Sequence, residues 1–123
     1  MKSSIMKQVL LEAEKSSSKF GIGAVIFKGS RIFGIGHNST RGSFIPDRFK
    51  RYPNSFHAEI AAMYNVSDNN KINGASILVV RVTKSGNISK AFPCKYCMKT
   101  LKHIGIKNIY YSNRQGEIVR RKI

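Results

Sequence analysis

Two short segments decide the fold of this chain: His57-Ala58-Glu59 and Pro93-Cys94-Lys95-Tyr96-Cys97. Zinc prefers tetrahedral sites of nitrogen and sulfur, and a catalytic site takes three ligands from the protein and leaves the fourth position to water. His57, Cys94 and Cys97 would fill three positions, and these two cysteines are the only ones in the chain. Glu59 adds a carboxylate that can move protons to and from the metal-bound water. The two segments therefore predict a catalytic site with one Zn²⁺ per chain.

Each segment is predicted to open a helix. Asn54 and Ser55 are good N-cap residues ahead of a helical run over Phe56–Tyr64. Pro93 suits the first helical position, which would place the two cysteines one turn apart on the same face. The positive ends of the two helix dipoles would favour the thiolate forms. We therefore expect two helix starts to converge on a single ion.

This arrangement resembles the zinc-dependent nucleobase deaminase superfamily, whose signature is H-x-E followed by P-C-x-x-C. The superfamily includes cytidine, deoxycytidylate, tRNA adenosine and polynucleotide cytosine deaminases. The resemblance runs from about Phe20 to Tyr111. It implies that His57, Cys94 and Cys97 are zinc ligands and that Glu59 is the general acid/base. It further implies that water activated on zinc attacks C4 of cytosine, or C6 of adenine, with loss of ammonia.

The resemblance also suggests residues that bind the substrate. Asn38 matches an asparagine that contacts the sugar or the base, although turn chemistry alone would also explain Asn38-Ser39-Thr40. Ala58 matches the position whose backbone N–H contacts the base carbonyl. Tyr96 lies between the cysteines, where it can stack on a base or cover the metal. His37 is expected to be a strand-end histidine and not a ligand.

Two other readings of the cysteine pair are weaker. A thioredoxin-like redox pair also uses C-x-x-C at a helix start, but that fold needs a later cis-proline, and no proline follows Pro93. That reading also leaves His57 and Glu59 unexplained. A purely structural zinc site would need a fourth ligand, and His37 and His103 are the only other histidines.

The remaining pattern predicts an α/β three-layer sandwich in a single domain, residues 1–123, with a five-stranded mixed sheet flanked by helices. Apolar residues at helical spacing predict a first helix over Ser4–Lys15. The region Thr83–Ala91 is expected to be a loop. Phe33 and Ile35 are expected to share the buried face of their strand. The strands are expected at Gly21–Phe27, Arg31–Gly36, Ala75–Val82, Lys107–Ser112 and Gly116–Lys122, with the apolar run Ala75–Val82 as the buried central strand.

The connection between the last two strands is short. Asn113-Arg114-Gln115-Gly116 offers too few residues for a parallel crossover, which needs a dozen or more. An antiparallel hairpin is therefore expected. Within the superfamily this resembles the branch of cytidine deaminases, toxin deaminases and plant RNA-editing domains, whereas a histidine as first ligand is unlike the free-cytidine enzymes of that branch. These two features point to different branches, so they do not decide the substrate class.

The chain is strongly basic, with 22 Lys and Arg against 6 Asp and Glu and a formal net charge of +16. Such a field attracts phosphates, although biased genomic composition would explain part of it. No stretch approaches the ~20 apolar residues of a membrane span, and two cysteines at metal spacing fit a reducing compartment. We therefore expect an intracellular, cytoplasmic protein without membrane association.

The region between residues 41 and 52 interleaves basic and aromatic side chains, a combination with which proteins track phosphates and stack on the bases of single strands. A solvated loop whose aromatic residues pack on the core is the alternative. The candidate contacts to nucleic acid are Arg41, Arg48, Lys50, Arg51 and Tyr52.

Three functions follow from these observations. The first is deamination of cytosine in a nucleotide or nucleoside, with a (d)CMP-like substrate preferred because of the charge. The second is deamination of cytosine, or less readily adenine, in single-stranded DNA or RNA. The third is a non-catalytic, zinc-stabilised module that binds nucleic acid, against which Glu59 argues. Superfamily members commonly form dimers or tetramers, so a homo-oligomer is compatible with each function.

Overall fold

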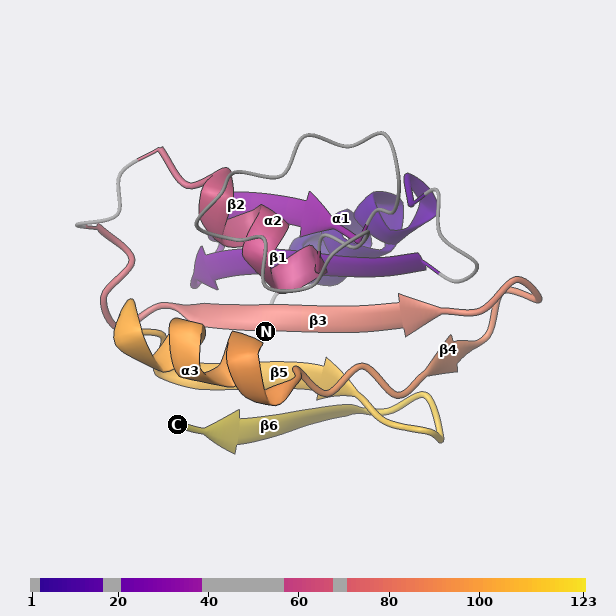
Figure 1. Cartoon of the computed structure of the whole chain (residues 1–123). Helices are drawn as coiled ribbons and strands as arrows, with labels where there is room; N and C mark the ends of the chain where they lie inside the picture. The colour runs from indigo at the N-terminus through magenta and orange to yellow at the C-terminus, as the bar shows by residue number, and fades with distance from the viewer. Residues whose placement is uncertain (1–2, 17–20, 39–56, 68–70) are drawn as a thin grey trace.

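A mixed β-sheet forms the middle layer of the molecule (Figure 1). The computed structural model describes residues 3–16, 21–38, 57–67 and 71–123. The strands of the main path lie in the order β2-β1-β3-β5-β6, and the two-residue strand β4 pairs with β3 beside this path. Their bounds are β1 Gly21–Lys28, β2 Arg31–His37, β3 Ser76–Val82, β4 Ile88–Ser89, β5 Asn108–Ser112 and β6 Ile118–Lys122. The predicted α/β sandwich with a mixed sheet is confirmed.

Strand β3 is the centre of the sheet, as its apolar run predicts. It pairs antiparallel with β1 and parallel with β5, and its residues 77–80 are buried. Strands β5 and β6 form the predicted antiparallel hairpin, with Gly116 at φ +81° in the connection. The prediction of a plain loop over Thr83–Ala91 was wrong, because β4 within it pairs with the end of β3. A two-residue strand made by a long-range pairing leaves no periodic pattern in the sequence.

Helices cover both faces of the sheet (Figure 1). Helix α1 (Ser3–Glu14) packs Ile5 and Val9 on one face, against buried residues of β1 and β3. Helices α2 (Ala58–Tyr64) and α3 (Lys95–His103) lie on the other face, around a larger cluster that includes Cys97 and Leu101. Burial of these side chains drives the assembly of the layers. The sheet therefore separates α1 from the two helices that begin near the cysteines.

Helix α2 lies unusually close to strand β2, because two glycines of β2 face it. A Cβ atom at Gly34 would lie 2.4 Å from the backbone oxygen of Ala62, and one at Gly36 would lie 2.4 Å from Ala62 N. The small residues Ala61 and Ala62 on the helix complete this close contact. The packing of glycine against alanine thus fixes how far α2 stands from the sheet.

A β-bulge changes the side that Phe33 faces. The register shifts between Ile26 and Phe27, which pair with Gly34 and Ile32 respectively, so Phe33 is the extra residue of β2. As a result, Phe33 packs against the α2 and α3 cluster, whereas Ile35 packs against the α1 cluster. The expectation that Phe33 and Ile35 share one face was wrong, because a bulge interrupts the alternation of side chains.

No helix within the described part of the chain is long and apolar enough to cross a membrane.

Candidate metal and catalytic site

Helix α2 begins at the first candidate ligand. His57 is its N-cap residue, with extended backbone angles, and the backbone oxygen of His57 accepts a hydrogen bond from Ala61 N at 2.9 Å. The prediction that Asn54 or Ser55 caps this helix was wrong, because the helix starts at Ala58. The imidazole of His57 makes no capping hydrogen bond to the helix. It is instead directed at the two cysteines.

Helix α3 begins in the same way at the second candidate ligand. Cys94 is its N-cap residue, and the Sγ atom of Cys94 accepts a hydrogen bond from Cys97 N at 3.4 Å. The prediction that Pro93 is the first helical residue was therefore wrong, because the helix starts at Lys95. This hydrogen bond ties the Cys94 sulfur to the backbone of Cys97. The cap thus places Cys94 and Cys97 at one spot.

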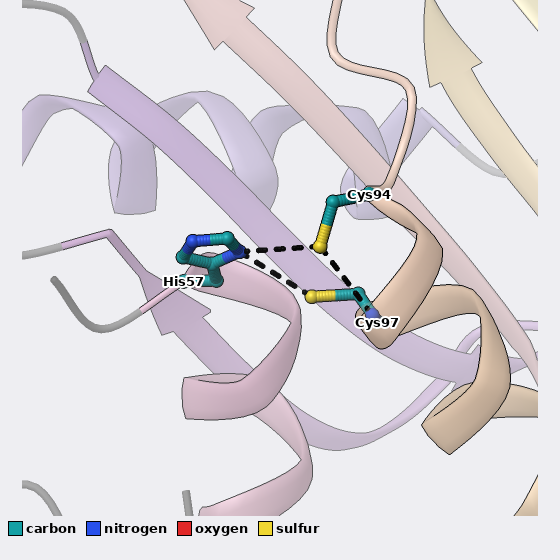
Figure 2. Close-up of side chains that lie close together, drawn as sticks. All are labelled: His57, Cys94 and Cys97. Carbon is teal, nitrogen blue, oxygen red and sulfur yellow. Dashed lines mark hydrogen bonds between the residues drawn. The ribbon is translucent and has the colours of Figure 1, made fainter. Parts of the chain in front are cut away.

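The three donor atoms meet between the starts of α2 and α3 (Figure 2). His57 Nδ1 lies 3.7 Å from Cys94 Sγ and 3.5 Å from Cys97 Sγ. Zinc–sulfur distances near 2.3 Å and zinc–nitrogen distances near 2.0 Å, at a tetrahedral angle, place nitrogen and sulfur about 3.6 Å apart. The observed separations therefore fit one tetrahedral ion. Within the described residues, His57, Cys94 and Cys97 form a group able to bind one metal ion.

Glu59 lies in the first turn of α2, two residues beyond His57. Its side chain is buried, and burial raises the pKa of the carboxyl group. Hydrogen bonds to its own backbone N–H and to the Cys97 side chain act in the opposite direction. The second of these contacts places the carboxyl group beside one of the candidate sulfur ligands. Glu59 is thus positioned to exchange a proton with a group bound at the metal position.

The electrostatics of the site call for a cation. Burial raises the pKa of the Cys97 thiol, and the neighbouring Glu59 and Cys94 raise it further by repulsion. Burial also lowers the pKa of His57, which favours the neutral imidazole that binds metals. A buried carboxyl group beside the Cys97 sulfur is costly unless a positive charge compensates it. A divalent cation at this position would offset that cost and stabilise the thiolates.

The structure places the three candidate substrate-binding residues in different settings. Ala58, backbone included, is 1% exposed and lies at the start of α2, next to His57. Tyr96 packs partly against the core cluster around α3, which suits a covering role. Asn38 follows β2, and its side-chain oxygen accepts a hydrogen bond from Ile22 N at 2.8 Å. The role of each in substrate binding stays a prediction.

The remaining candidate residues do not join the metal-binding group. His103 lies exposed at the end of α3, and His37 contacts Glu12 through Nδ1. His37 is therefore a strand-end histidine, as expected. The candidate nucleic-acid contacts Arg41, Arg48, Lys50, Arg51 and Tyr52 lie outside the described residues.

The burial of one charged residue, Glu12, was not predicted from the sequence. Glu12 is 4% exposed, although it belongs to an amphipathic helix whose other charged residues face solvent. The helical period does place Glu12 beside Val9 and Ala13, on the buried side of α1. That spacing is the signal that would have found it.

The chain resembles known deaminases both in its sequence profile and in its fold. The profile of the cytidine and deoxycytidylate deaminase zinc-binding region matches residues 1–113. A crystal structure of the deoxycytidylate (dCMP) deaminase of cyanophage S-TIM5, in apo form, is 25% identical, with a TM-score of 0.64, and the match covers 93% of this chain and 86% of that one. The cytidine deaminase of Burkholderia pseudomallei is 21% identical and shares the fold with a TM-score of 0.71 over 99% of this chain and 92% of that one. No curated protein sequence matches the chain.

The family profile spans nearly the whole chain and both halves of the candidate site. Its members are zinc-dependent hydrolases that remove an amino group from cytosine. With a His-Cys-Cys group able to hold one metal ion and the fold of its structural relatives, this chain belongs to the cytidine and deoxycytidylate deaminase family.

Proposed function

We propose that this protein deaminates the cytosine of a pyrimidine nucleotide, with a (d)CMP-like substrate, at a zinc site held by His57, Cys94 and Cys97. Glu59 is the general acid/base. The observation that carries this proposal is the separation of the donor atoms, 3.7 and 3.5 Å from His57 Nδ1 to the two sulfurs. These values suit tetrahedral zinc, and a buried carboxyl group lies beside them.

The overall reaction converts cytosine and water to uracil and ammonia. When bound, zinc supplies a water of lowered pKa as the nucleophile. Glu59 would accept a proton from the attacking water and pass protons to N3 of the ring and to the departing amine. The buried Glu59 carboxyl group suits both transfers, because it lies beside the candidate ligand Cys97 and can take up and release a proton there.

Other groups of the chain bind and orient the base. The backbone N–H of Ala58 lies in the first turn of α2, where helix geometry provides no intrahelical acceptor. It would donate to the carbonyl oxygen of the base. Asn38 would contact the sugar or the base through its amide. Tyr96 would close the pocket beside the cysteines or stack on the ring.

Two observations support a phosphate-bearing substrate over a free nucleoside. The chain carries a net charge of +16, which attracts phosphates. The phage protein that it resembles at 25% identity is a dCMP deaminase, and a structure of that protein is a complex with dCMP and dUMP.

Single-stranded nucleic acid is the second candidate substrate. The same charge supports it, as does the basic and aromatic composition of residues 41–52. The antiparallel β5–β6 hairpin is also the arrangement of the superfamily branch that contains deaminases acting on polynucleotides.

One assay separates these candidates. The zinc-loaded protein is incubated with cytidine, CMP, dCMP, single-stranded DNA and single-stranded RNA, and conversion of cytosine to uracil is read by mass. We expect conversion of a mononucleotide, and conversion slower by ~10²–10⁴-fold in the Glu59→Gln variant under the same conditions. Conversion of polynucleotides alone would replace the first candidate by the second. A zinc-loaded wild type that converts no substrate would overturn the proposal.

A further inference from the structure

A buried carboxylate on α1 holds the end of strand β2, on the side of the sheet opposite the cysteines. The side chain of Glu12 is only 6% exposed, and its Oε1 lies 2.8 Å from His37 Nδ1. Its Oε2 makes an ion pair with Lys15 Nζ at 3.2 Å, but no well-aligned hydrogen bond. Because Lys15 is 59% exposed, this ion pair contributes little. The contact with His37 is therefore the main compensation for burying Glu12.

Asn38, the residue after His37, is held by three hydrogen bonds to two partners, Ile22 and Ser16. Its backbone N–H donates to the oxygen of Ile22 at 3.0 Å, and its side-chain Oδ1 accepts from Ile22 N at 2.8 Å. Its backbone oxygen accepts from Ser16 Oγ, just after α1, at 2.9 Å. Strand β1 and the end of α1 together set the orientation of the Asn38 amide. A hydrogen bond from this side chain to a substrate would be donated by Nδ2.

We propose that Glu12 and His37 are positioning residues that hold Asn38 in its substrate-binding orientation; this inference rests on the proposed function. His37 and Asn38 share a peptide bond, so the contact between Glu12 and His37 limits rotation of the backbone that carries the Asn38 amide. Glu12 on α1 contacts His37 at the end of β2, and Ser16, just after α1, donates a hydrogen bond to the next residue, Asn38. Helix α1 would thereby influence substrate binding through the end of β2, without touching the substrate.

This chain of contacts predicts a particular kinetic effect. Glu12 and His37 lie outside the group formed by the three candidate ligands, so their loss leaves the proton transfer unchanged. A substrate contact that is equally strong in the ground state and the transition state affects KM and not kcat. A role in helix packing alone would instead lower stability and leave KM of the folded protein unchanged. The separation of KM from kcat therefore distinguishes the two roles.

The test compares zinc-loaded variants with dCMP as substrate and dUMP as a binding probe. Glu12→Ala removes the acceptor, and His37→Ala removes the donor at a half-buried site that tolerates change better. Glu12→Gln keeps an oxygen that can accept from Nδ1–H. Glu14→Ala removes an exposed charge from the same helix turn and is the matched control. Zinc content and Tm are measured for every variant.

In Glu12→Ala and His37→Ala we expect KM for dCMP and Kd for dUMP to rise roughly three- to tenfold, the value of about one hydrogen bond. We expect kcat within about twofold of wild type and unchanged zinc content. Glu12→Gln should recover most of the loss, and Glu14→Ala should match wild type. If Glu12→Ala fails to fold, His37→Ala decides.

Unchanged KM and Kd in a folded His37→Ala or Glu12→Ala protein would overturn the positioning role while leaving the proposed function intact, as would an equal rise in Glu14→Ala. A wild type that binds dUMP without turning over dCMP would overturn the proposed function, while Kd would still test the positioning role. A zinc-loaded wild type that neither binds nor converts a pyrimidine nucleotide would overturn both.

Discussion

Adding one methyl group at Gly36 should move helix α2 and weaken the candidate metal site. A Cβ atom there would lie 2.4 Å from Ala62 N and 2.6 Å from Ala61 Cβ. Ordinary contacts begin near 3.4 Å, so α2 and β2 must separate by about 1 Å in a close-packed interior. Overpacking of this kind costs about 1–3 kcal/mol of stability.

The displacement reaches the site because α2 begins at His57. Metal–ligand distances tolerate shifts of about 0.2 Å, so moving the helix start by a larger amount should weaken zinc binding roughly tenfold or more. A misplacement of about 1 Å can lower a reaction rate about 100-fold. We therefore expect Gly36→Ala to fold, with reduced stability, weaker zinc affinity and a kcat/KM about 100-fold below wild type.

The assay measures zinc affinity by competition with a chelator, stability by urea denaturation and kcat/KM for dCMP. Gly23→Ala is the matched control, because its Cβ would lie 2.3 Å from Val9 O, on helix α1. It should lose similar stability, yet keep zinc affinity near wild type. Wild-type zinc affinity in a destabilised Gly36→Ala protein, or equal losses of affinity in the two variants, would refute the reasoning.

Four further predictions can be tested. Cys94→Ala removes a candidate ligand and the N-cap hydrogen bond to Cys97 N, so metal analysis should fall from about one zinc per chain to none and Tm should drop; full zinc retention would contradict the ligand assignment. Glu59→Gln should keep zinc while turnover falls by ~10²–10⁴-fold, and near-normal turnover would assign the proton transfer elsewhere. Burial raises the pKa of Glu59 in the folded protein above its ordinary value of 4.5. As pH rises above that value, Glu59 loses its proton more readily in the unfolded chain, so the metal-free wild type should become less stable. Urea denaturation across this pH range should show a smaller loss of stability in Glu59→Gln. On the polynucleotide reading, neutralising Arg48, Lys50 and Arg51 together should flatten the salt dependence of single-strand binding by two or three contacts, each worth ~0.7 in slope, and identical binding at every salt concentration would remove that role.

The chemistry of the site can be predicted from the sequence, because it depends on the identity and spacing of a few residues. A histidine with a carboxylate two residues later, and two cysteines three residues apart after a proline, specify a donor set and a proton carrier. The apolar run of β3, residues 77–80, predicts its central position, since a strand buried on both faces carries apolar residues on both. The short connection at Gly116 predicts the antiparallel β5–β6 hairpin, because no crossover fits into it.

Only the tertiary structure decides which residues cap the helices, which face a side chain occupies and which charged residue is buried, because long-range contacts override local preference. His57 is the N-cap residue of α2 in place of the stronger cap formers Asn54 and Ser55, and Cys94 is that of α3, with Pro93 before the helix. The bulge in β2 turns Phe33 to the face opposite Ile35. Glu12 is buried against His37, and Gly36 admits a helix that follows it by more than twenty residues. Each of these features depends on a partner that is distant in the chain, and only the packed fold brings that partner within reach.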